Sequence, residues 1–230
     1  MVLRQVLRFS LITGRIDMCY MGVDLSSSPK RPSTAAVIDG DGVLLSLSQF
    51  NTYRELLGLL GSHPLDLIGI DAPLGLPLGL HCLDSHCPCS PTNGHKGRMA
   101  EVELAKMGIG CFYTGKNSIV RKLIYRAVKL GNSLRRRYYD TVEIYPYATK
   151  FLIFGADLPS KKRPESLTYL REYLPKLVPG LEPYIASLDH DVADAILTAY
   201  TGYLHKLGRT RQLGIAEEGL ITIPIPSEES

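Results

Sequence analysis

The sequence predicts an α/β fold in one domain. Three observations predict it: an early β-hairpin signal, short apolar runs of strand length, and amphipathic segments of helical periodicity that come after them. Of the 230 residues, 45% are hydrophobic and 21% are charged, which is typical of a soluble globular protein. A chain of this length can bury one sizeable core, and the sequence has no internal repeat.

The sequence predicts strands and one helix in the first part of the chain. Gly40-Asp41-Gly42 is a hairpin turn between two apolar runs, and Thr52 with Glu55 forms a capping box, so a helix is expected from there to about Gly61. The run LDLIGID is almost wholly apolar, as in a central strand covered by helices on both faces. The predicted strands of this part are residues 19–25, 34–39, 43–48 and 65–71.

A long loop is predicted at residues 72–97, which are rich in proline and have no clear periodicity. A loop of this length inside a compact domain is usually functional or mobile. Helical periodicity returns after it, and Pro146 is expected to end the regular pairing of the following strand. The predicted helices are residues 98–107, 117–138, 164–174 and 190–207, and the predicted strands are 141–147 and, at a sheet edge, 220–225.

The single domain is expected to span residues 19–226. Residues 1–18 are predicted to be an extension outside it, either disordered or the product of an overextended start, because they lack the features of a signal peptide. No apolar stretch approaches the roughly 20 residues of a membrane span, so no membrane partner is expected. The five cysteines are odd in number and mostly crowded into one loop, which is no disulfide framework and favours a cytoplasmic protein.

Five acidic residues stand out because they lie in or beside apolar segments, where an unpaired carboxylate is costly. They are Asp24, Asp71, Glu143, Asp191 and Asp194. The first three belong to predicted strands, where the alternative is a turn acid or a side chain on a solvated face. The last two share one face of a predicted helix. Helix capping explains Asp191 readily, but Asp194 precedes three apolar residues and should face the core. Carboxylates from distant parts of the chain are therefore expected to meet at one point.

Such a cluster has the chemistry of a divalent-metal site. Carboxylates are ligands that Mg²⁺ and Mn²⁺ prefer, so all five acids are candidate metal ligands. In a two-metal centre, ions about 3.5–4 Å apart activate water and stabilise the leaving oxygen of a phosphodiester. The formal net charge of +3 is too small by itself to identify a nucleic-acid partner. Four basic residues are candidates for binding substrate phosphates, although each also fits a surface charge: Arg98, Lys116, Arg121 and Lys150.

Several stretches of the chain resemble the family called domain of unknown function 429 (DUF429), whose members are described as predicted nucleases with a ribonuclease H-like fold. The matching stretches span residues 22–224 and are GVDLSSSP, IGIDAPLGLP, RMAEVELAKMGI, VEIYPYATK, DHDVADAILTAYTGYL and EEGLITIP. The resemblance implies a mixed five-stranded sheet, in which three antiparallel strands continue into a parallel part, with helices on both faces. The wording DVADA is also similar to the last acidic motif of resolvase-like nucleases.

The leading hypothesis is a metal-dependent nuclease that hydrolyses phosphodiester bonds of DNA or RNA. Its catalytic residues would be Asp24, Asp71, Glu143 and Asp194, with Glu143 completing the metal shell or orienting water. One alternative is an actin-like or sugar-kinase-like phosphotransferase or ATPase, since those proteins share the strand order and an early aspartate. Another is a noncatalytic module that binds nucleic acid or protein, because a fold does not guarantee chemistry. If the carboxylates converge, Asp194→Asn should stabilise the metal-free protein, by about 1 kcal/mol.

Three cysteines in the predicted loop raise a separate possibility, a structural zinc site. Cys82, Cys87 and Cys89 lie close in sequence to three histidines, so four soft ligands are available: the histidines are His81, His86 and His95. The spacing Cys-x4-Cys-x-Cys is not that of a standard zinc knuckle. The sequence therefore favours a reduced, partly buried loop over zinc.

Overall fold

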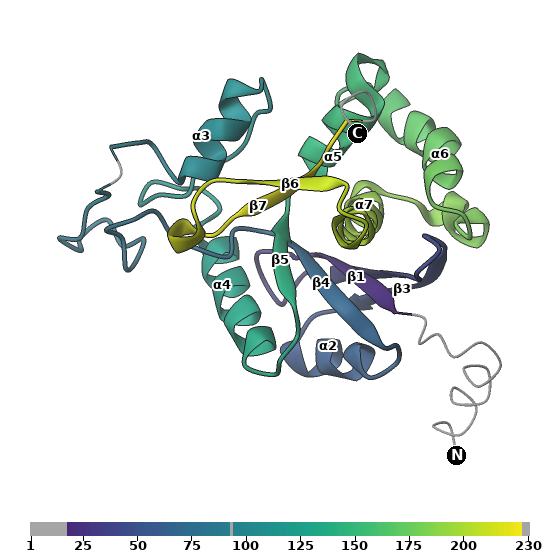
Figure 1. The fold of residues 1–230 in the computed structure, drawn as a ribbon, viewed down its shortest axis with the longest axis horizontal. Coiled ribbons are helices and arrows are strands. Elements are labelled where there is room, and N and C mark those ends of the chain that lie inside the picture. The colour runs from purple at the N-terminus through teal and green to yellow at the C-terminus, as the bar shows by residue number, and fades with distance from the viewer. Residues whose placement is uncertain (1–17, 93, 227–230) are drawn as a thin grey trace.

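The computed structural model describes residues 18–92 and 94–226, which contain one mixed sheet with helices on both faces (Figure 1). The predicted extension at residues 1–18 lies almost wholly outside this part. The strands are β1 (Cys19–Asp24), β2 (Ser33–Ile38), β3 (Leu44–Phe50), β4 (Leu65–Asp71), β5 (Thr141–Ile144), β6 (Thr210–Leu213) and β7 (Ile221–Pro224). The helices are α2 (Tyr53–Leu60), α3 (Met99–Lys106), α4 (Arg121–Arg135), α5 (Pro146–Phe154), α6 (Glu165–Leu177) and α7 (His190–Lys206), with short 3₁₀ helices at Gly155–Asp157, Glu182–Ser187 and Ala216–Glu218.

The strand order in the sheet is β3-β2-β1-β4-β5-β7-β6. β2 pairs antiparallel with both β1 and β3, whereas β1, β4, β5 and β7 pair in parallel. This confirms the predicted α/β fold, including three antiparallel strands that continue into a parallel part. The predicted five-stranded sheet is wrong, because the sheet has seven strands. The strand predicted at residues 220–225 is present as β7, but it lies inside the sheet beside β5, and the unpredicted β6 pairs antiparallel with it as the edge strand.

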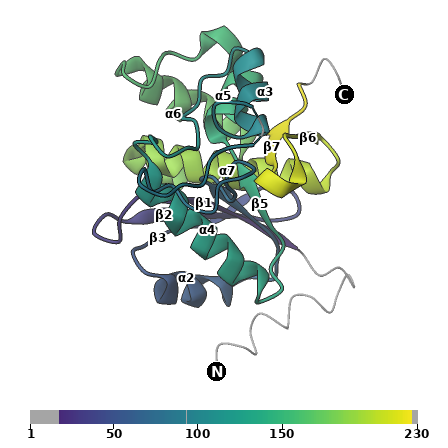
Figure 2. The same cartoon turned by 90° about the vertical axis from the view of Figure 1, so that its left-hand side faces the viewer.

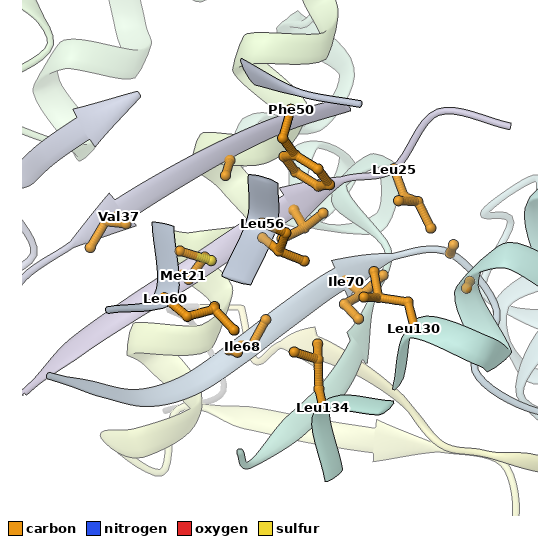
Figure 3. Packing of buried hydrophobic residues seen from close by; sticks show 14 of the residues in the cluster. Met21, Leu25, Val37, Phe50, Leu56, Leu60, Ile68, Ile70, Leu130 and Leu134 are labelled. Carbon is orange, nitrogen blue, oxygen red and sulfur yellow. The ribbon is translucent and has the colours of Figure 1, made fainter. Parts of the chain in front are cut away.

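Side chains alternate between two cores that lie on opposite faces of the sheet. On one face, α2 and α4 pack against β1 and β4 through residues such as Leu56, Ile70 and Leu134 (Figure 3). Met21 of β1 belongs to this core. Gly22 and Asp24 are an odd number of residues away from it on the same strand, so they face the other side of the sheet.

The other face is covered by α7, with α6 further out (Figure 2). Ala195, Ile196 and Ala199 of α7 pack with Ala36 and Ile38 of β2 in the second core. The six residues that follow Asp194, AILTAY, carry no charge, so this part of α7 can be buried against the sheet. The two faces therefore differ in one respect that matters for function: the strand-end aspartates lie on the α7 side.

The segment after β5 differs from the prediction. A strand was expected over residues 141–147, but β5 ends at Ile144 and α5 begins at Pro146. Proline is well suited to the first position of a helix, because its missing N–H is unpaired there in any case. The predicted helix 117–138 is also shorter at both ends, as α4. The consequence is that α5 projects Lys150 towards α7.

Between Asp71 and Met99, the described residues form neither helix nor strand. Both ends of this long loop are held by the buried carboxylate of Glu218, which accepts hydrogen bonds from Leu78 N at 2.8 Å and Met99 N at 2.6 Å. Among residues 18–92 and 94–226, none of the helices has the length and apolar character needed to cross a membrane.

Candidate active site

Asp24 and Asp71 end two neighbouring parallel strands. They are register partners on β1 and β4, as are Gly22 and Gly69 two residues earlier. Register partners lie on the same face of a sheet, and neighbouring strands are about 4.8 Å apart. The backbone pairing therefore places the two carboxyl groups side by side on the face that α7 covers.

The two glycines allow α7 to lie close to this face. A Cβ added at Gly22 would come within 2.1 Å of the backbone nitrogen of Ala199, so no other residue fits there without moving the helix. A Cβ added at Gly69 would lie 2.9 Å from the methyl carbon of Thr198. Gly22 and Gly69 thus fix the distance between α7 and the ends of β1 and β4.

Asp194 is brought to the strand ends by the direction of α7. The helix runs against β4, because Gly202 lies over Leu67 and Thr198 lies over Gly69. One further helical turn back from Thr198 is Asp194, and two further residues along β4 is Asp71. A helical turn advances about 5.4 Å and two strand residues about 6.6 Å, so the two positions coincide. Three acids from β1, β4 and α7 therefore converge.

The like charges of these acids alter their protonation. Burial, followed by the negative charges of Asp194 and Asp191, raises the pKa of Asp24 to about 7. Burial also raises the pKa of Asp71 well above its usual value, and the charges of Asp194 and Asp24 raise it further. Near neutral pH, a share of the Asp24 carboxyl groups therefore holds a proton. A cation bound between the acids would relieve the repulsion that raises both pKa values.

Two lysines pair with Asp194. Lys150 donates to its Oδ1, and Lys161 donates to its Oδ2 at 3.1 Å. The Lys150 side chain is 6% exposed, whereas that of Lys161 is 57% exposed. Lys150, a predicted candidate for binding substrate phosphate or else a surface charge, is thus an internal counter-charge of Asp194. Lys161 lies at the solvent side of the same carboxylate.

Glu143 is separated from the three aspartates by the register of the sheet. Its partner on β4 is Ile70 and not Asp71, so its side chain leaves the sheet on the face of α2 and α4. Its two oxygens accept hydrogen bonds from Nη1 and Nη2 of Arg98 at 2.7 and 2.6 Å. Breaking a buried ion pair of this kind is costly. The sequence predicted Glu143 as a metal ligand and Arg98 as a phosphate-binding residue, but the structure pairs them with each other.

The Arg98 guanidinium is the centre of a buried network. Its Nε also donates to Glu101 at 3.0 Å, and Glu101 accepts a hydrogen bond from Thr114 N at 2.7 Å. Burial lowers the pKa of Arg98, but the charges and hydrogen bonds of Glu143 and Glu101 outweigh it and raise the pKa overall. Glu143 in addition accepts from Leu74 N at 2.7 Å, which anchors the chain just after Asp71. The network therefore joins β5, α3 and the segment that carries Asp71.

A cavity of about 350 Å³ opens at these strand ends. Its charged lining includes Lys161 and the three aspartates, with the Arg98–Glu143 pair beside them. Phe112 and Tyr147 also line it, and they are 63% and 47% exposed. The cavity therefore offers carboxylates to a cation, an ammonium group to an anion, and aromatic rings to a planar group.

Three other predicted site residues do not line the cavity. Asp191 is exposed in the first turn of α7, from where its charge still contributes to the raised pKa of Asp24. Lys116 donates to the carbonyl oxygen of Cys87, and Arg121 donates to that of Leu83 at 3.2 Å, so both contact the long loop. The sequence reasoning did not single out Lys161 as a site residue. The basic run Lys161-Lys162-Arg163 was the available signal, and such runs are usually solvated.

No family model and no curated protein sequence matches the chain, so membership of DUF429 stays a prediction. Among solved structures, the chain is similar to that described as "Thermus thermophilus RuvC structure", with a TM-score of 0.44 and 12% sequence identity. The match covers 83% of this chain and 97% of that one. At this level of similarity, the roles of individual residues rest on the geometry of the chain itself.

Proposed function

We propose that the protein is a metal-dependent nuclease whose centre is formed by Asp24, Asp71 and Asp194. The observation that carries the proposal is the register pairing of Asp24 with Asp71, with Asp194 placed over them from α7. Bringing three acids together raises the pKa of two of them and costs folding free energy. Costly clusters of this kind in a cavity are typical of functional sites.

The donor atoms of this cavity fit Mg²⁺ or Mn²⁺. Carboxylate oxygens suit hard divalent ions. The one thiol in the lining, Cys111, is a poor competitor, because burial and the charge of Glu101 raise its pKa to about 11. When bound, one or two such ions would lower the pKa of a coordinated water and offset charge on the phosphodiester. We leave Glu143 out of the ligand set, because Arg98 engages both of its oxygens.

The remaining residues divide into two roles. Lys150 holds the Asp194 carboxylate in place from the interior, while the exposed Lys161 is positioned to neutralise a substrate phosphate. Phe112 and Tyr147 present rings on which a nucleobase can stack, which favours a nucleic-acid substrate over a compact phosphate ester. The substrate class is therefore DNA or RNA.

Arg98 and Glu143 are positioning residues in this scheme. The hydrogen bond from Leu74 N to Glu143 fixes the chain three residues after Asp71. Because the Arg98–Glu143 pair is buried and bidentate, that anchor is rigid. The pair keeps the Asp71 carboxyl group at the strand end without contacting the metal or the substrate.

We also propose a cytoplasmic location. All five cysteines are free thiols in the structure. Proteins of oxidising compartments commonly use their cysteines in disulfides.

The test is a substrate panel with the full-length protein. Labelled single-stranded, duplex and branched DNA and single-stranded RNA are incubated with Mn²⁺, with Mg²⁺ or with a chelator, and ATP turnover is measured in parallel. We expect cleavage of at least one nucleic acid in the presence of metal and none with the chelator. ATP turnover without cleavage would favour the phosphotransferase instead. Nucleic-acid binding without either reaction would favour the noncatalytic module.

A further inference from the structure

The long loop between β4 and α3 contains a compact cluster of soft ligands, which differ in chemistry from the carboxylates of the acidic cavity. The cluster consists of His81, Cys82, Cys87 and Cys89, all within nine residues of the chain. One ligand atom from each of the four lies within 4.8 Å of all the others.

The distances between these atoms match a tetrahedral zinc site. With Zn–S near 2.3 Å and Zn–N near 2.0–2.1 Å, two sulfur ligands are about 3.8 Å apart, and sulfur and nitrogen ligands about 3.6 Å. The Sγ atoms of Cys82 and Cys89 are 3.9 Å apart, and Cys87 Sγ is 3.6 Å from His81 Nε2. Two opposite edges of the tetrahedron therefore have the lengths that zinc requires.

The structure also distinguishes His81 from His86, the other histidine in this part of the loop. His86 adjoins Cys87 as His81 adjoins Cys82, so the sequence alone does not distinguish them. The His86 side chain is 93% exposed and its Nδ1 lies 3.4 Å from an Asp84 oxygen. His81 is therefore the nitrogen ligand of the cluster, and His86 is a natural control.

Two cations outside the cluster provide an independent indication. Zinc with three thiolates and one imidazole carries a net negative charge, which needs compensation in its surroundings. Lys116 donates to the carbonyl of Cys87, and Arg121 donates to the carbonyl of Leu83, both within the ligand loop. Two residues predicted to bind substrate phosphates are thus placed around the soft cluster instead.

Few side chains of the loop are fully buried where it packs against α4. Its apolar contacts with α4 form a small core of Leu80, Leu83 and Ile124, and Leu83 N donates to the Tyr125 hydroxyl at 2.6 Å. Small units with few buried side chains often depend on a structural metal. A metal that cross-links residues 81–89 would hold the loop against α4.

We propose that His81, Cys82, Cys87 and Cys89 bind one structural Zn²⁺. Thiolate and imidazole ligands select zinc over Mg²⁺ or Mn²⁺, so this site and the carboxylate centre take different metals. Four protein ligands leave no open coordination position, so the site is structural and not catalytic. The loop starts directly after Asp71 and ends at Arg98, so zinc fixes the segment that joins the proposed metal ligand to its positioning network.

The experiment begins with metal analysis of the full-length protein, purified with a reductant and without chelator from zinc-supplemented medium. The expected content is about one zinc per chain. Cys87→Ser should abolish stoichiometric zinc binding. His81→Ala should lower the zinc affinity, measured by competition with a chromophoric chelator, by more than about tenfold. The matched controls His86→Ala and Cys111→Ser should retain zinc like the wild type.

Cobalt replacement gives a readout that does not depend on the variants folding. Co²⁺ in the wild-type protein should show the near-ultraviolet thiolate charge-transfer band and the intense visible bands of a tetrahedral sulfur-rich site. Wild-type protein with less than about one-fifth of a zinc per chain would overturn the proposal. Absence of the thiolate charge-transfer band from the cobalt-loaded protein, or equal loss of zinc from the His81 and His86 variants, would also overturn it. None of these outcomes depends on nuclease activity.

Discussion

Asp24 and Asp71 are register partners at the ends of two adjacent parallel strands, and the charge of Asp24 contributes to the raised pKa of Asp71. Burial is the larger cause, and Asp194 adds to it from α7. The pairing of β1 and β4 therefore builds electrostatic repulsion into the fold. A bound cation removes that repulsion, which links the stability of the protein to metal binding and pH.

The first prediction is that Asp24→Asn stabilises the metal-free protein above neutral pH. The folded pKa of Asp24 is about 7, raised from an ordinary value near 3.8. Between these values the native state holds more protons than the unfolded state, so stability falls as pH rises through this window and stays low above it. Asparagine removes that loss. At about pH 8 with a chelator, the variant should melt about 2–4 °C higher, which for a chain of this size corresponds to about 1 kcal/mol.

Thermal melts across this pH range check the prediction. The two proteins should converge as the pH falls to about 3, where Asp24 is largely protonated in both folded and unfolded states. A stability difference that is the same at both ends of the range would show that Asp24 is not electrostatically strained.

The second prediction reverses the expectation from the sequence for Asp194. Neutralising it was expected to relieve repulsion and stabilise the protein. The structure pairs Asp194 with the buried Lys150, so Asp194→Asn removes the counter-charge of a buried ammonium group. We expect a destabilisation of about 1–3 kcal/mol in the metal-free protein, measured by urea unfolding. A more stable variant would mean that repulsion among the acids outweighs the ion pair.

The third prediction concerns metal and pH together. Mn²⁺ should stabilise the wild type by about 2.7 kcal/mol at one hundred times its dissociation constant. Its affinity should fall as pH drops below about 7, because Asp24 then holds a proton that the metal must displace. Titration calorimetry at about pH 6 and 8 measures both the affinity and the protons released. Equal affinities at the two pH values would show that Asp24 is not a metal ligand.

The fourth prediction distinguishes Glu143 from the aspartates. Glu143→Gln should destabilise the protein by about 1–3 kcal/mol, because Arg98 keeps its buried charge and loses an ionised partner. The affinity for Mn²⁺ should stay within about twofold of wild type, whereas Asp71→Asn should lower it by more than about tenfold. Comparable losses of Mn²⁺ affinity in both variants would restore Glu143 as a ligand.

Sequence reasoning singled out Asp24, Asp71 and Asp194, which the fold brings together, because acids at the ends of apolar segments are chemically conspicuous. It misplaced Glu143 because the face of a strand residue depends on the register with its neighbour. Glu143 pairs with Ile70, and a shift of one residue would have placed it beside Asp71. No local pattern in TVEIYPY contains that information.

The partners of the acids were missed for a related reason. Lys150 belongs to α5, and Pro146 was interpreted as the end of a strand when it is the first residue of a helix. The strand predicted at residues 220–225 is β7, but the four-residue β6 is too short to give a periodic signal and was not predicted. Local chemistry was thus readable from the chain, but the long-range pairing that decides what each charge contacts was not.

The most direct test of the proposed centre is metal-dependent cleavage by three aspartate variants under identical conditions. Asp24→Asn and Asp71→Asn remove one charge each at the paired strand ends, and Asp41→Asn removes one in an exposed hairpin turn far from the cavity. With Mn²⁺ and the nucleic acid that the wild type cleaves, we predict a loss of more than about a hundredfold for the first two, as for removal of an essential catalytic group. Asp41→Asn should cleave at the wild-type rate. Equal cleavage by the wild type, Asp24→Asn and Asp71→Asn would contradict a nuclease centre at these residues.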